Sequence, residues 1–242
     1  MDRADLGRAA TTGVGALAML VFITILYPAP SAILFLGLVL GSLSALVAMG
    51  LVLIYRANRI VNFAQGDMGA MASVLAASLY VGPKWPFFVC VAVGLVAALA
   101  TGVAVEVGLI RRFKNAPRLV LTVATIGISQ LLAAIQLGLP QLFNFDTAPQ
   151  PPVPFDFTFR WFPVVFRGGH LLIVIVVPLV AAGLVLFFRR SRVGIAIRAA
   201  AESANRAALL GIPVKRINTL VWVLAAGMSG TGVLLRLPIQ GV

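Results

Sequence analysis

Long apolar segments separated by shorter polar stretches form the main pattern along this chain. A helix rises about 1.5 Å per residue, so roughly 20 apolar residues cross the hydrocarbon core of a bilayer. Five segments reach or approach that length, and two others, 13–27 and 68–81, are shorter. The pattern predicts an all-α integral membrane protein, a polytopic bundle of six or seven membrane segments: 13–27, 31–55, 68–81, 87–110, 119–139, 171–188 and 217–237.

The first apolar segment allows two interpretations, a retained helix or a cleaved signal peptide. The residues that follow it, Ala29-Pro30-Ser31, make a poor cleavage site because proline obstructs cleavage. We therefore expect residues 13–27 to be a retained first helix.

A polar stretch, Arg56–Asp67, interrupts the apolar pattern after the second segment. Gly66 is expected to break the helix, and Asp67 can accept hydrogen bonds from the first N–H groups of the next one. The break has two interpretations. It lies at membrane depth, where protein or a water-filled cavity must cover irregular backbone, or it is a plain cytoplasmic turn followed by a tilted short helix.

Small and polar residues recur at helical spacing inside two crossings. In the crossing 31–55, Gly37, Gly41 and Ala45 recur every four residues, which predicts a face where another helix approaches closely. In the crossing 87–110, Gly94, Ala98, Gly102 and Glu106 lie four residues apart on one face. A carboxylate within a membrane is costly without a partner. Glu106 therefore either reaches toward the basic residues at 111–114 or belongs to a substrate path.

A hydroxyl stripe occupies the crossing 119–139, with polar residues at i, i+3 and i+7. Such hydroxyls bond their own backbone or a neighbouring helix, or they line a pathway. Together with the break, the stripe defines a candidate translocation path: Asn62, Gln65, Gly66, Thr122, Thr125 and Ser129.

The polar loop Arg189–Arg216 is longer than a turn between two crossings requires. Ser203 can cap a short helix, Ala204–Leu210, and Gly211 suits the position just beyond its end. This helix would end in Leu209 and Leu210 and could dock on a partner. The alternative is a solvated basic connector.

Composition excludes a soluble protein. The chain is 61% hydrophobic and 11% charged, with a mean hydropathy of +1.05, whereas soluble domains are about 25% charged. The net charge of +12 does not indicate a nucleic-acid partner, because the basic residues cluster between apolar runs. No Gly-Lys dipeptide, and hence no P-loop, is present, and the lone Cys90 and His170 suggest neither a metal nor a cofactor. We expect no enzymatic activity.

Two motifs resemble the branched-chain amino-acid ABC transporter permease family. Ala200-Ala201-Glu202, followed by Gly211-Ile212, resembles the loop with which importer permeases dock on their ATPase. Asn62-Phe63-Ala64-Gln65-Gly66 is similar to a second signature of the same family. Gln65 stands where the family commonly has histidine, and Ser203 stands where it usually has an acidic residue.

The resemblance implies a permease subunit in the bacterial inner membrane that moves branched-chain amino acids or related small solutes. The resemblance covers roughly residues 37–242. We expect one transmembrane domain over residues 1–242, a portion of a longer permease if the chain is truncated at its C-terminus, with a cytoplasmic docking loop at 189–216. Its partners would be ABC ATPase subunits, a second permease subunit (separate or fused) and an extracytoplasmic solute-binding protein. The residues expected to couple to the ATPase are Glu202, Ser203, Leu209, Leu210 and Gly211.

A secondary transporter or a channel without an ATPase partner is the alternative function. A secondary transporter needs ion-coupling groups within the membrane, and Glu106 is the only acidic residue in a predicted crossing. A channel would have no use for an ATPase-docking helix. Co-purification of an ATPase subunit would separate these possibilities.

Charge predicts the orientation of the chain. Fifteen of the nineteen basic residues fall in the N-terminal tail, Arg56–Arg59, the 111–118 segment and the loop Arg189–Arg216, all on one side of a seven-crossing topology. By the positive-inside rule that side, including the N-terminus, is cytoplasmic.

The orientation can be tested with single cysteines at Ser203 and Gln150 in a background in which Cys90 is replaced. An impermeant thiol reagent added to intact cells is expected to label only position 150, because Pro140–Gly169 lies outside the cell in this topology. Labelling at position 203 would overturn it.

Overall fold

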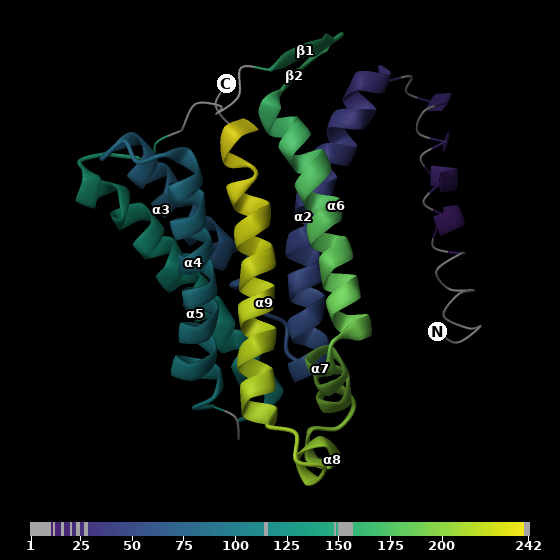
Figure 1. The fold of residues 1–242 in the computed structure, drawn as a ribbon, viewed down its shortest axis with the longest axis vertical. Coiled ribbons are helices and arrows are strands. Elements are labelled where there is room, and N and C mark those ends of the chain that lie inside the picture. Colours follow the sequence, from purple (N-terminus) through teal and green to yellow (C-terminus); the bar gives the residue numbers. More distant parts are fainter. Residues whose placement is uncertain are drawn as a thin grey trace.

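The computed structural model describes residues 29–113, 116–147, 149 and 157–239, with 11, 13–15, 17–19, 21–22 and 25–26. Within these residues, five helices are long and apolar enough to cross a membrane, and they match five predicted crossings. They run along the long axis of the molecule (Figure 1). Their bounds are α2 Ser31–Asn58, α4 Phe87–Val105 with its π-helical continuation η1 Glu106–Ile110, α5 Arg118–Gly138, α6 Gly168–Arg190 and α9 Val214–Leu234.

The two short predicted crossings have different outcomes. Residues 68–81 lie in α3 (Gln65–Val81), whose 17 residues fall just below the length of the five candidate spans. Several residues of 13–27 lie outside the described part of the chain, and those described are helical and exposed. The all-α membrane class is confirmed, with five candidate spans in the described residues.

Helix α9 lies at the centre of the bundle, packed against α2, α3 and α4 (Figure 1). Half of its apolar window is buried (50%), compared with 11% for α6. Small side chains permit this central position, because helices in lipid associate through close packing. A Cβ atom on Gly102 of α4 would come within 2.8 Å of the Trp222 carbonyl oxygen of α9. Substitution there requires the two helices to separate.

The row of small residues in α4 packs closely, since Gly94, Ala98 and Gly102 are all buried. The prediction of a close-approach face at Gly37, Gly41 and Ala45 of α2 is wrong for the described chain, because all three residues are exposed. Neither Gly37 nor Gly41 has an atom within 4 Å of an added Cβ, and both are exposed. This face of α2 contacts no other described part of the chain closely.

Aromatic side chains organise one end of the bundle. The strands β1 (Thr158–Trp161) and β2 (Val164–Arg167) form an antiparallel hairpin. Phe166 of the hairpin contacts Phe35 of α2, with ring centroids 5.4 Å apart, and Trp161 packs beside both rings. Before the hairpin, Pro140–Phe143 forms the 3-10 helix η2.

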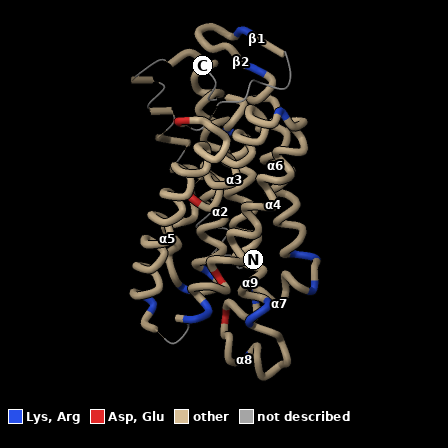
Figure 2. The backbone as a smooth tube through the Cα atoms, turned by 90° about the vertical axis from the view of Figure 1, so that its left-hand side faces the viewer, with Lys and Arg blue, Asp and Glu red and all other residues tan. Residues whose placement is uncertain are grey.

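The opposite end carries α7 (Arg192–Glu202) and α8 (Ala204–Leu209), and most of the described Lys and Arg positions lie toward that end of the backbone (Figure 2). Helix α7 was not predicted. The described residues of 140–167 and the segment 191–213 thus lie at opposite ends of the bundle (Figure 1), which is the relative placement that the charge pattern predicts. The assignment of the basic end to the cytoplasm stays a prediction.

Candidate functional site

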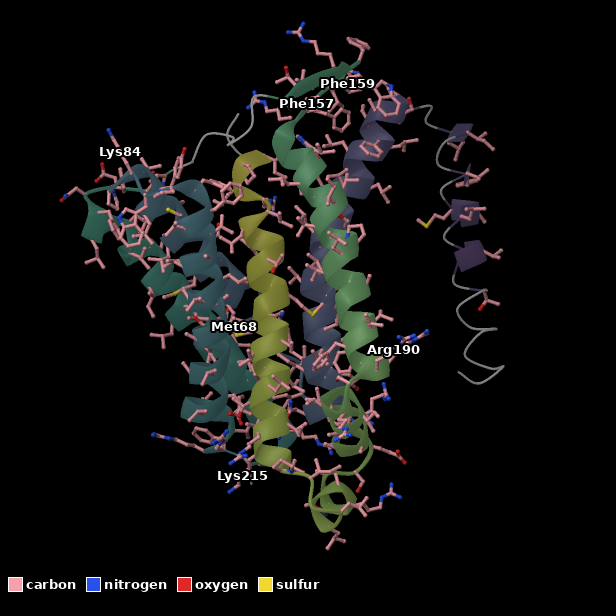
Figure 3. All side chains as sticks on the ribbon, viewed as in Figure 1. Met68, Lys84, Phe157, Phe159, Arg190 and Lys215 are labelled. Carbon is pink, nitrogen blue, oxygen red and sulfur yellow. The ribbon has the colours of Figure 1, made fainter. Side chains whose placement is uncertain are left out.

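The backbone break between α2 and α3 forms the first part of the site. Helix α2 ends at Asn58, and the capping residue that follows it, Arg59, adopts a left-handed conformation with φ of 56°. The Asn62 side-chain oxygen then accepts the backbone N–H of Ala64 at 3.1 Å, and the Asn62 carbonyl accepts that of Gln65 at 3.3 Å. These bonds fold the chain back into α3. Figure 3 places Met68, in the first turns of α3, inside the bundle between the ends marked by Lys84 and Lys215.

The prediction that Gly66 breaks the helix is wrong. Gly66 lies inside α3, and the left-handed residue of the break is Arg59. Asp67 lies in the first turn of α3, where a carboxylate suits the positive end of a helix, but it makes no side-chain capping bond. Its carboxylate instead accepts a hydrogen bond from the Ser129 hydroxyl of α5.

The Gln65 side chain joins three helices at the start of α3. Its amide nitrogen donates to the Ala225 carbonyl of α9 at 2.8 Å, and its amide oxygen accepts from Asn62 at 3.2 Å. The Ser229 hydroxyl of α9 donates to the Gln65 carbonyl at 2.6 Å. On α2, a Cβ at Gly50 would lie 2.3 Å from the Gln65 amide nitrogen. Only glycine at position 50 leaves room for this side chain.

The hydroxyl stripe of α5 supports the break from the other side. The Thr125 hydroxyl oxygen accepts the backbone N–H of Phe63 at 3.1 Å and lies 2.7 Å from the Thr122 carbonyl and 3.3 Å from the Val61 carbonyl. Asn62, Gln65 and Thr125 are 0–2% exposed. Asn62 and Gln65 bond each other, and all three residues bond backbone groups of the turn or of the neighbouring helices. They therefore hold the backbone in place and do not face open space.

Two residues of the same turn point the other way. The Phe63 side chain is 54% exposed, and Gly66 is exposed with no atom within 4 Å of an added Cβ. Asp67 and Ser129 are half-buried beside them. The turn therefore has a packed side toward α9 and an open side at Phe63 and Gly66.

An ion pair between a buried carboxylate and a partly exposed arginine lies nearer the basic end. Glu106 is 3% exposed, and its carboxylate accepts from Arg111, with an N–O distance of 2.8 Å. The Thr219 hydroxyl of α9 lies 2.9 Å from the same carboxylate oxygen and accepts from Arg111 at 2.7 Å. The expected reach of Glu106 toward the basic cluster is confirmed at Arg111. The π-helical turn η1 begins at Glu106, so this network joins η1 to the first turns of α9.

The basic loop contains the helix that its sequence predicts. In α8 the Ser203 hydroxyl accepts the backbone N–H of Arg206 at 3.3 Å, and Gly211 follows with φ of +79°. Leu209 and Leu210 are 88% and 80% exposed. Glu202 pairs with Arg206 at 3.5 Å across the cap, and both side chains are largely exposed. An exposed pair of this kind contributes about 0–1 kcal/mol, so it does not by itself explain why Glu202 is there.

Helix α7 attaches α8 to the bundle. The Ser191 hydroxyl caps α7 by accepting the Gly194 N–H at 2.8 Å. Ile197 and Ala200 of α7, and Ala207 of α8, belong to the same buried cluster as Ile54 of α2 and Val221 of α9. The loop is therefore a folded unit whose exposed leucines lie at its tip.

Comparison with known proteins identifies the family. The family described as "Branched-chain amino acid transport system / permease component" matches residues 33–240. The chain belongs to this family. It is a family of transport permeases and not of enzymes.

Curated relatives of this permease are similar over most of its length. The high-affinity branched-chain amino acid transport system permease protein LivH of Escherichia coli K12 is 32% identical over 220 residues, 84% of this chain and 69% of the relative. BraD of Pseudomonas aeruginosa is 29% identical, covering 82% and 68%. The probable LivH of Methanocaldococcus jannaschii is 29% identical, covering 80% and 62%. No solved structure matches the permease significantly.

The structure brings most of the sequence-predicted path residues of the permease together, at the junction of α3, α5 and α9. Thr122 contributes only its carbonyl to the bonds described above. Sequence reasoning missed the residues that hold the junction from other helices: Gly50, Ala225 and Ser229. It also missed Thr219 beside Glu106. The sequence around Gln65 does not indicate these contacts, because Gly50, Ala225 and Ser229 belong to other helices and the last two lie far away in the sequence.

The role of Gln65 can be tested by Gln65→Leu and Gly50→Ala. Gln65→Leu leaves the Asn62 side-chain nitrogen without its acceptor and removes the side-chain donor to the Ala225 carbonyl, a loss of about 1–3 kcal/mol. Gly50→Ala displaces the same side chain. Both variants are expected to unfold at lower temperature than the parent in detergent, monitored by size-exclusion chromatography after heating.

Gly41→Ala, on the same helix with no atom within 4 Å, is the matched control and is expected to unfold like the parent. A Gly50→Ala protein as stable as Gly41→Ala would contradict the assigned close approach.

Proposed function

We propose that this chain is the membrane subunit of a bacterial ABC importer that moves branched-chain amino acids or related small solutes across the inner membrane. Separate ATPase subunits supply the energy, a solute-binding protein delivers the solute, and a second permease subunit completes the path. The substrate class is supported by the names of the relatives, which are branched-chain amino acid permeases from two bacteria and an archaeon.

The observation that carries the proposal is the tip of the basic loop. Two adjacent leucines are 80% or more exposed, on a short helix that Ser203 caps at one end and Gly211 closes at the other. Exposed apolar residues on a rigid element among basic residues suit a partner protein, which would cover them. We assign that partner as the ATPase, with Glu202, Ser203, Leu209, Leu210 and Gly211 as the coupling residues.

The coupling we propose passes from α8 through α7 into the bundle. Ala207 and Ile197 pack into the buried cluster that includes α9, so a movement of α8 is transmitted to α9 rather than absorbed by a flexible loop. Farther along α9, Ala225 and Ser229 hold Gln65 at the start of α3. Movement of α9 would then reposition the turn at Asn62–Gly66.

The open side of that turn is our candidate for the translocation path. Phe63 and Gly66 are exposed there, with the Asp67–Ser129 pair beside them. In this proposal Asn62, Gln65, Thr122 and Thr125 position the turn, while Gly66 and Ser129 face the path between the two permease subunits. Pairing of Glu106 with Arg111 disfavours the alternative of a secondary transporter, because an ion-coupling carboxylate must be free to exchange its ion.

Replacement of the exposed leucines tests the ATPase partner. Leu209→Ser combined with Leu210→Ser is expected to weaken co-purification of the ATPase subunit by about tenfold or more, because exposed apolar side chains at a contact centre contribute most to binding. Uptake of radiolabelled leucine should fall in parallel.

Leu142→Ser is the matched control, since Leu142 is 81% exposed at the hairpin end of the bundle. Unchanged ATPase recovery with the double variant, or an equal loss with Leu142→Ser, would refute docking through α8.

Rigidity of the docking helix can be tested separately at Gly211. Its φ of +79° strains a β-branched residue by about 1–2 kcal/mol, while the space around it is open. Gly211→Val is expected to abolish substrate-stimulated ATP hydrolysis in the assembled complex. Gly211→Asn should retain most of it, because asparagine tolerates the left-handed region. Full stimulation in Gly211→Val would make the loop a connector only.

A further inference from the structure

A cavity of about 370 Å³ opens at the basic end of the bundle, between α2, α6 and α7. Its walls are mostly apolar, with Leu53 and Ala57 from α2, Val185 and Phe188 from α6, and Ile197 from α7. Helix α6 is the least buried of the five candidate spans, so the cavity adjoins a helix whose apolar surface this chain leaves exposed. The apolar walls fit a hydrocarbon chain.

Three arginines line the same cavity, one from each helix: Arg56 of α2, Arg189 of α6 and Arg198 of α7. Arg198 donates to the Phe188 carbonyl, which holds it at the mouth of the cavity. Among the described residues, no carboxylate forms an ion pair with any of the three. The three helices contain a single acidic residue, Glu202, and it pairs with Arg206 of α8. Three guanidinium groups without a counter-charge favour an anionic ligand.

We propose that this cavity binds an anionic phospholipid, with its phosphate at the three arginines and one acyl chain along the apolar walls. Guanidinium groups bind phosphate through paired hydrogen bonds, and basic pockets between membrane helices on the cytoplasmic side are suited to such headgroups. A free phosphate would leave the apolar walls unoccupied, and a neutral lipid would leave the arginines without a partner of net negative charge. The ligand must therefore carry both a negatively charged phosphate and a hydrocarbon chain in one molecule.

The position of the site gives the lipid a structural role. The cavity lies where α7 meets α2 and α6, and α7 connects α6 to the capped helix α8. A lipid bound there bridges all three helices and holds α7 against the bundle. This inference does not depend on the ATPase partner, because it concerns only groups of this chain.

Native mass spectrometry of the full chain in detergent tests the site directly. Dioleoylphosphatidylglycerol or dioleoylphosphatidylcholine is added in steps, and the fraction of protein with one bound lipid is measured. The parent is expected to bind the anionic lipid more tightly. Arg56→Gln with Arg189→Gln should weaken its binding by about tenfold or more, since each basic residue near an anionic lipid contributes about 1 kcal/mol.

The matched control is Arg190→Gln with Arg192→Gln. These arginines flank the α6–α7 junction without lining the cavity, and Arg190 extends away from the bundle (Figure 3). The control should retain the preference for phosphatidylglycerol. Equal affinity of the parent for the two lipids, or an equal loss in the control pair, would overturn the proposal.

Three further measurements separate charge from shape and lipid from phosphate. Ala57→Phe fills the cavity without changing charge and should weaken phosphatidylglycerol binding in a protein that elutes as the parent does. Unchanged binding would overturn the acyl-chain part of the proposal.

Arg56→Lys with Arg189→Lys keeps the charge and should keep most of the binding, even if the glutamine pair fails to fold. Displacement of the lipid by millimolar inorganic phosphate would identify a free-phosphate site and refute the lipid assignment.

Discussion

The hydrogen bond from the Gln65 amide to the Ala225 carbonyl is the interaction on which the centre of the bundle depends. In lipid, backbone that leaves a helix must satisfy its polar groups within the protein. Asn62, Gln65 and Thr125 supply the partners for the turn between α2 and α3, and all three are fully or almost fully buried. The close approach that brings these partners together needs a glycine at position 50. The helices must therefore pack closely at this point for the polar groups of the turn to find their hydrogen-bond partners.

Small residues also allow neighbouring helices to pack closely at other positions along α9. Where Ser229 donates to the Gln65 carbonyl, a Cβ on Gly69 of α3 would lie 2.6 Å from the Ser229 backbone oxygen. On the other flank, Gly102 lets α4 approach the backbone of α9 at Trp222. Lipid supplies no hydrophobic force between helices, so such contacts decide which helices associate. Helix α6 lacks them with α9 and instead packs mainly against α2, which explains its high exposure.

Much of this arrangement could be predicted from the sequence. The remaining parts could not be predicted, and the reason in each case is physical. Five crossings follow from apolar length, and the Ser203 cap and left-handed Gly211 follow from local backbone chemistry. Gly66 was a reasonable but wrong position for the break, because a left-handed arginine is uncommon; Arg59 adopts that conformation while its N–H bonds the Tyr55 carbonyl at 2.8 Å. The bond between Gln65 and Ala225 spans 160 residues, and no local pattern encodes such a contact.

The position of α9 between the basic loop and the buried turn gives the two candidate functional regions a physical connection. The first turns of α9 hold Thr219 against the Glu106–Arg111 pair, and its middle holds Gln65. A rigid helix that is held at both places moves as one body, so displacement at the loop changes the geometry at the turn. Breaking the ion pair would leave a buried carboxylate uncompensated, which is costly. In the coupling proposed above, the Glu106 network is therefore expected to stay intact, so that η1 shifts together with α9.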